Sequence, residues 1–213
     1  MSPGKKSSKY CIPELIRLIT TAVFSIAICF TLTLTKPWQP IVRFDSEMIR
    51  VTVDPERISV DGLYRLYNPL PFPMTQWFFY PTPEGGGLEP ADQLNVERLP
   101  DQPEAVSEHL TPVRQGNLEH YRVRVPGRGF LEVRAVYSQR HNGAYGRYIL
   151  TTTAGWGRPL RHAQFELTLE SLDLVDSNYE LSGKGGGLWT FQRTGFMPPE
   201  DWVFTFKRVG DIS

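Results

Sequence analysis

The sequence predicts an all-β protein, an antiparallel two-sheet β-sandwich preceded by a single N-terminal transmembrane helix. After residue 40, apolar and polar side chains alternate with the period of two that is typical of strands. No stretch there repeats apolar residues with the 3.6-residue period of an amphipathic helix. The extended segments are short and are separated by Gly, Pro, Asn or Asp, and one uncharged apolar stretch precedes them all.

That apolar stretch predicts a membrane anchor. It contains 17 uncharged residues, from Leu18 to Leu34, which is close to the minimum length of a spanning helix. Three lysines and Arg17 precede it, so the positive-inside rule places the N-terminus in the cytoplasm. We therefore expect a cytoplasmic basic flank at 1–17, a transmembrane signal-anchor at 18–35, a linker at 36–46 and a periplasmic or extracellular β-sandwich domain at 47–213.

A cleaved signal peptide is the alternative, because basic, apolar and polar regions follow one another in the order that such peptides have. The apolar stretch is longer than usual for a signal peptide, however, and no small-x-small cleavage site follows it. We therefore favour the uncleaved anchor.

Nine or ten short strands without intervening helices favour a sandwich over any βαβ architecture, with a partly closed barrel as the alternative. Asp61-Gly62 is expected to form a hairpin or bulge, and residues 88–113 a long surface excursion or a short helix near 104–109. The clearest segments are residues 49–53, 57–67, 76–80, 148–153, 163–172, 178–183, 188–194 and 202–208.

Residues 119–137 predict a hairpin with the loop Pro126-Gly127-Arg128-Gly129-Phe130. Val125 would then lie opposite Leu131, and Val123 opposite Val133. One face of the pair is wholly apolar in this register, whereas a shift by one residue would place charges among the apolar side chains.

Charge and cysteine content exclude several classes of function. Five of the 23 basic residues and one of the 23 acidic residues lie in the first 36 residues, which leaves 18 basic against 22 acidic in the domain. A domain with this net charge of −4 and no basic run lacks the footprint of a nucleic-acid-binding protein. Cys11 and Cys29, the only cysteines, precede the domain, so we expect no disulfide, zinc ribbon or thiol chemistry within it.

The sequence contains no recognisable catalytic or metal-binding pattern. The four histidines are far apart and lack ligand spacing, and no Gly-x-Ser-x-Gly motif is present. We therefore expect no enzyme activity, no cofactor and no metal, with a hydrolase whose catalytic residues are dispersed along the chain as a minor possibility.

Aromatic density is the feature that stands out. Four consecutive aromatic residues, 77–80, place rings on both faces of one strand, which a strand with one solvated face does not need. These rings either fill a thick core or form an exposed patch that stacks on sugars or contacts a protein. The candidate contact surface comprises Trp77, Phe79, Tyr80, Trp156, Arg158 and Trp189.

Residues 148–169 carry a local resemblance to other proteins. The run Tyr148-Ile149-Leu150-Thr151-Thr152 leads through Trp156-Gly157-Arg158-Pro159-Leu160 into an extended segment. This pattern resembles one found in uncharacterised exported bacterial β-sandwich domains of unknown function. The resemblance implies an envelope location and a fold class, and it implies no catalytic residue.

Two functions from different classes follow. The first is a non-catalytic interaction or assembly module that is tethered by residues 18–35 and contacts an envelope or surface protein. The second is a tethered carbohydrate-binding or glycan-processing domain that uses exposed aromatic rings. Coplanar exposed rings would favour the second function, and buried rings the first.

Overall fold

The computed structural model describes residues 40–100, 106–115 and 118–210. The predicted basic flank and membrane anchor, and residues 36–39 of the predicted linker, lie outside these residues. Within the described ranges, no helix is long and apolar enough to cross a membrane.

The all-β prediction is confirmed, because the described residues form 14 strands and a single short 3₁₀ helix. The helix, η1, spans Thr151–Trp156. The strands are β1 (Arg43–Val53), β2 (Arg57–Tyr67), β3 (Met74–Phe79), β4 (Asn95–Arg98), β5 (Glu108–His109), β6 (Val113–Gln115), β7 (Leu118–Val125), β8 (Phe130–Arg140), β9 (Tyr145–Tyr148), β10 (Leu160–Leu169), β11 (Leu172–Ser177), β12 (Ser182–Gly185), β13 (Leu188–Phe196) and β14 (Trp202–Arg208).

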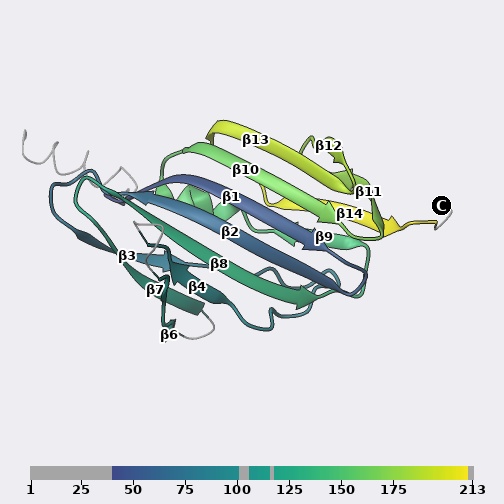
Figure 1. Ribbon diagram of the computed structural model, residues 1–213, viewed down its shortest axis with the longest axis horizontal. Coiled ribbons are helices and arrows are strands. Elements are labelled where there is room, and N and C mark those ends of the chain that lie inside the picture. The colour runs from purple at the N-terminus through teal and green to yellow at the C-terminus, as the bar shows by residue number, and fades with distance from the viewer. Residues whose placement is uncertain (1–39, 101–105, 116–117, 211–213) are drawn as a thin grey trace, which may run out of the picture. The chain divides into compact units, whose positions relative to one another are not determined.

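The strands form three sheets rather than the two that the sequence predicted. The largest has eight strands in the order β12-β13-β10-β1-β2-β8-β4-β5, and the others have the orders β11-β14-β9 and β3-β7-β6. Figure 1 shows β13, β10, β1, β2 and β8 side by side in the large sheet. The pairing of β1 with β10 is parallel, so the sheet is not purely antiparallel.

One face of the large sheet is buried, and both small sheets cover that face. On β1 the side chains of Ile49, Val51 and Val53 are buried, while Arg50 between them is exposed. The ring of Trp202 on β14 packs 5.7 Å from Phe165 on β10, which joins the β11-β14-β9 sheet to the core. The ring of Phe78 on β3 packs 5.3 Å from Tyr64 on β2, which joins the β3-β7-β6 sheet to the same core.

The predicted hairpin at 119–137 is wrong, although its apolar faces are buried as expected. β7 pairs with β3 and β6, whereas β8 pairs with β2 and β4. The connection packs against the chain that follows β2: Arg128 N donates a hydrogen bond to Leu70 O at 2.7 Å, and a Cβ at Gly127 would stand 2.6 Å from the backbone of Pro71. The connection at Gly127 thus carries the chain from the β3-β7-β6 sheet to the eight-stranded sheet.

Two other predicted segment boundaries also change. β9 ends at Tyr148, and η1 replaces the predicted strand at 148–153. β1 begins at Arg43, inside the range predicted as linker, because Val42 and Phe44 are already part of the core.

The remaining local predictions have mixed outcomes. Asp61-Gly62 does not interrupt β2, which pairs continuously with β8. The described part of 88–113 forms the short strands β4 and β5 and the start of β6, and its residues 106–109 contain no helix.

Gln139 on β8 predicts a stabilising substitution. Its side chain is fully buried, and neither amide atom has a hydrogen-bond partner. Buried polar atoms without partners cost stability, so Gln139→Met, which keeps the shape, is expected to raise the free energy of unfolding by about 1–2 kcal/mol in urea titrations. The same change at exposed Gln192 on β13 is the control and should be nearly neutral. A loss of stability in Gln139→Met would show that the amide is hydrogen-bonded in solution.

Candidate functional site

The candidate site lies where the three sheets meet. Glu47 on β1 is paired directly with Tyr64 on β2 in the large sheet. Tyr148 ends β9 in the second sheet, and Tyr80 directly follows β3 in the third. These side chains line a cavity of about 240 Å³. An apolar cavity of roughly 150 Å³ accepts benzene, so this one has room for a small organic molecule.

The three tyrosine hydroxyls form a hydrogen-bonded cluster. Tyr64 Oη donates to Tyr80 Oη at 2.9 Å and lies 2.6 Å from Tyr148 Oη. Tyr80 and Tyr148 are hydrogen-bond partners as well, so each of the three hydroxyls contacts the other two. Burial raises the pKa of Tyr80 to about 12 and those of Tyr64 and Tyr148 well above their ordinary value, so all three are neutral at pH 7.

Gly62 makes room for this cluster. It lies two residues before Tyr64 on the same face of β2, and the ring of Tyr64 folds back over it. A Cβ at position 62 would overlap Tyr64 Oη and stand 2.6 Å from Tyr64 Cζ. Asp61-Gly62 was interpreted from the sequence as a turn signal, but its glycine leaves space for a ring.

Glu47 is the most unusual group of the site. Its side chain is buried, with 5% of the residue surface exposed, and Oε1 has no hydrogen-bond partner. Desolvation raises the pKa of its carboxyl group from 4.5 to about 8. The sequence interpretation missed this residue. It did carry a signal, because Glu47 has the same parity as the apolar residues Ile49, Val51 and Val53 and so faces the core.

The 3₁₀ helix η1 forms one wall of the cavity. Thr152, Thr153 and Trp156 of η1 line the space, and the Trp156 ring packs 5.6 Å from Phe44. β3 and the segment that follows it contribute residues 76–81 to the lining. The lining comprises Pro40, Phe44, Glu47, Tyr64, Gln76, Trp77, Phe78, Phe79, Tyr80, Pro81, Tyr148, Ile149, Thr152, Thr153, Gly155 and Trp156.

Asp201, just before β14, holds the start of η1 in place. Its Oδ1 accepts hydrogen bonds from Leu150 N at 3.1 Å, Thr151 N at 3.1 Å and Thr151 Oγ1 at 2.8 Å. Asp201→Ala removes this cap and is expected to lower the free energy of unfolding by about 1 kcal/mol. Thermal denaturation measures the stability, and Asp176→Ala at an exposed position of β11 is the control. Equal stability of the two variants would contradict the capping role.

The structure brings together four of the six residues predicted as a contact surface. Trp77, Phe79, Tyr80 and Trp156 all line the cavity. Trp77 is 50% exposed at its rim, whereas Tyr80 is buried. Arg158 and Trp189 do not line it. Trp189 lies on β13 opposite Leu167 and packs against the core, and Arg158 lies between η1 and β10.

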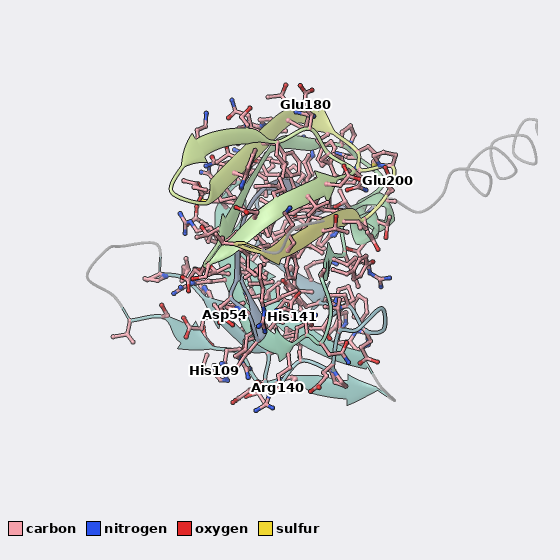
Figure 2. All side chains as sticks on the ribbon, turned by 90° about the vertical axis from the view of Figure 1, so that its right-hand side faces the viewer. Asp54, His109, Arg140, His141, Glu180 and Glu200 are labelled. Atoms are coloured by element: carbon pink, nitrogen blue, oxygen red, sulfur yellow. The ribbon has the colours of Figure 1, made fainter. Side chains whose placement is uncertain are left out.

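Two wider hollows lack the features of a site. One, of about 420 Å³, contains His141, and the other, of about 490 Å³, lies along β12 and β13. Both are lined mostly by exposed residues and contain no buried polar atom without a partner. Figure 2 shows His141 beside Asp54; its Nε2 lies 2.9 Å from Asp54 O, and its Nδ1 lies 2.8 Å from Gly143 O. Each ring nitrogen thus lies within hydrogen-bond distance of a backbone carbonyl oxygen. Within the described ranges, no His, Cys, Asp and Glu side chains gather as a metal site would require.

Comparisons with known proteins agree with the fold and add no family. Neither the models of protein families nor the curated proteins include a match to this chain. Among solved structures, a candidate nutrient-binding protein of Legionella pneumophila is similar, with a TM-score of 0.57 and 17% identity over 79% of this chain and 67% of that one.

An M1 zinc metallopeptidase of Deinococcus radiodurans matches less closely, with a TM-score of 0.43 and 10% identity. The alignment covers 77% of this chain and only 42% of the metallopeptidase, so this chain spans less than half of that enzyme's length.

Proposed function

We propose that the chain is a membrane-tethered, extracytoplasmic domain that binds a small ligand in the aromatic cavity and releases it unchanged. The observation that supports this most is the buried carboxyl group of Glu47, which faces a cavity of about 240 Å³ and has a partnerless oxygen. A carboxyl group without a partner lowers stability, and proteins retain such groups mainly where they serve a function. Apolar walls with a few convergent polar groups are typical of ligand sites.

The chemistry of the lining supports binding rather than turnover. General acid and base catalysis commonly uses two titratable groups whose pKa values are pushed apart. The described lining contains one carboxyl group, three neutral tyrosines and no His, Lys, Arg or Cys. A binding role also agrees with the description of the Legionella protein as a candidate nutrient-binding protein, which shares the fold.

The membrane anchor is part of the proposal and rests on the sequence. An apolar stretch at 18–34 behind a basic flank would hold the domain at the outer side of the membrane. A tether keeps a receptor near the membrane, where a captured small molecule can be passed on or sensed.

A ligand screen with the full-length chain tests the binding function. A true ligand is expected to raise the melting temperature of the parent, and Glu47→Gln and Trp156→Ala should lose that shift. Glu166→Gln is the matched control, because Glu166 lies on the outer face of the large sheet and pairs with Arg50 at 3.1 Å. Ligand recovered after incubation should be chemically unchanged. The proposal fails if no small molecule stabilises the parent, or if each one stabilises Glu47→Gln and Trp156→Ala equally.

Glycan binding is the second candidate, because half of Trp77 is exposed at the rim of the cavity. An exposed indole face can stack on a sugar ring, and the same ring could contact an envelope or surface protein. Glu47→Gln separates these from small-ligand binding. Trp77→Ala should abolish retention on a glycan array, or crosslinking to a membrane partner, whereas Glu47→Gln should leave both intact and lose only the thermal shift by a cavity ligand.

A further inference from the structure

The charge distribution around Glu47 limits what the cavity can bind. Three elements surround the carboxyl group in addition to its own strand: β2 presents Tyr64, β10 presents Ala163 and β9 presents Tyr148. Tyr80 adds a fourth, neutral group from the segment after β3. No cationic side chain is among the described residues that line the cavity. The described lining therefore supplies no positive charge for Glu47.

The walls of the cavity suit a positive charge. The faces of aromatic rings carry negative potential and attract cations, with tryptophan the most effective. Trp156 lines the cavity together with the rings of Phe44, Tyr64 and Phe78. Trp77 also borders it, but alternation along β3 turns its ring to the face opposite Phe78, where it packs 6.3 Å from His120. Rings and a carboxylate around one small space are the combination that binds ammonium groups in water-excluded sites.

Ligands of other charge fit less well. A carboxylate or phosphate group would meet no positive partner in the described lining and would be repelled by an ionised Glu47. A neutral polyol would use the tyrosine hydroxyls and leave the ring faces without a specific role.

We propose that the ligand is a small organic cation, a primary amine or a methylated ammonium compound, whose charge lies against the Glu47 carboxylate and between the aromatic rings. This rests on the proposed ligand-binding function and names the class of ligand for that site. The net charge of −4 over the domain favours the approach of a cation.

Cation binding requires Glu47 to lose a proton. In the ligand-free protein the pKa of Glu47 is about 8, so most molecules hold the proton at pH 7. A cation beside the group favours the carboxylate and lowers its pKa. The neutral acid and the cation thus form an ion pair, and one proton passes to the buffer. Affinity for a cation should increase about tenfold per pH unit up to about pH 8 and then level off.

Isothermal titration calorimetry on the full-length chain tests this with two matched probe pairs. Choline is compared with 3,3-dimethylbutan-1-ol, in which carbon replaces the charged nitrogen, and benzylammonium is compared with benzyl alcohol. At least one cation is expected to bind roughly tenfold or more tightly than its neutral partner. Titrations at pH 7 in phosphate and in MOPS, neither of which contains a primary ammonium group, should show release of close to one proton. Glu47→Gln should abolish both the preference and the release, and Glu166→Gln should keep them.

The possible failures are distinguishable. If the neutral compounds bind as tightly as the cations, or binding releases no proton, the ligand is not a cation, while the ligand-binding function stands. If both cations fail and the thermal-shift screen finds a neutral or anionic ligand that depends on Glu47, the cation inference is likewise wrong. If no compound binds in either experiment, both proposals fail.

Discussion

Gly62→Ala is expected to lower the free energy of unfolding by about 2 kcal/mol and to abolish ligand binding. The new methyl group would overlap the end of the Tyr64 side chain. Tyr64 cannot swing away freely, because it is buried and its hydroxyl is hydrogen-bonded to Tyr80 and Tyr148. Urea denaturation measures the stability, and titration with a cavity ligand measures the loss of the site.

Gly143→Ala is the control for this prediction. Gly143 has open space where its Cβ would lie and no positive φ, so alanine there should be nearly neutral. The double variant Gly62→Ala/Tyr64→Ala adds a second check. Once the ring is gone, alanine at 62 should cost little beyond the Tyr64→Ala change. If Gly62→Ala is as stable as Gly143→Ala, Gly62 does not serve as space for the Tyr64 ring.

The sequence predicts the strands well where one face is buried along the whole segment. The expected segment at 202–208 matches β14 residue for residue, and the one at 57–67 has the bounds of β2 but lacks the interruption expected at Asp61-Gly62. In both, alternation runs from end to end, so burial itself defines the strand. The prediction of a strand at 148–153 was wrong. β9 has only four residues and η1 begins two residues after it ends, and periodicity cannot distinguish a strand from a 3₁₀ helix over so short a stretch.

Strand pairing is less predictable than strand position. The apolar faces of β7 and β8 were predicted correctly, but the two strands pair in different sheets. The apolar faces of two consecutive strands can be buried in two ways. The strands can pair in one sheet, or they can lie in different sheets that pack against the same core. The parallel pairing of β1 with β10 joins residues more than 100 positions apart, such as Ile49 and Phe165, which local pattern does not reveal.

The site could be predicted only in part for the same reason. The aromatic cluster at 77–80 and Trp156 were visible as excess rings, and the structure places them around one cavity. The position of Glu47 was predictable as well, because it alternates in phase with the apolar residues of β1. Tyr64, Tyr80 and Tyr148 come together from three sheets. Their contact depends on long-range strand pairing, which local sequence patterns do not predict.

The largest expected effect concerns Glu47 and pH. The pKa of its carboxyl group is about 8 in the folded protein and has the ordinary value of 4.5 in the unfolded chain. Between these pH values the unfolded chain has lost the proton while the folded protein still holds it. The unfolded state then binds fewer protons, so stability falls as pH rises, by about 1.4 kcal/mol per pH unit. Below pH 4.5 and above pH 8 both states carry the same charge at this group, and the curve is flat.

Glu47→Gln removes this titration and keeps the size of the side chain. The variant is expected to match the parent near pH 4.5 and to exceed its free energy of unfolding by roughly 3 kcal/mol at pH 7, although it no longer binds ligand. Urea titrations at half-unit pH steps give the difference between the two proteins, in which the contributions of all other groups cancel. Glu166→Gln, on the solvated face, should differ from the parent by a small and nearly constant amount. A difference for Glu47→Gln that stays level from pH 4.5 to pH 8 would mean that the carboxyl group is ionised in the folded protein and has found a partner. The site would then lack the uncompensated acid on which the proposed cation binding depends.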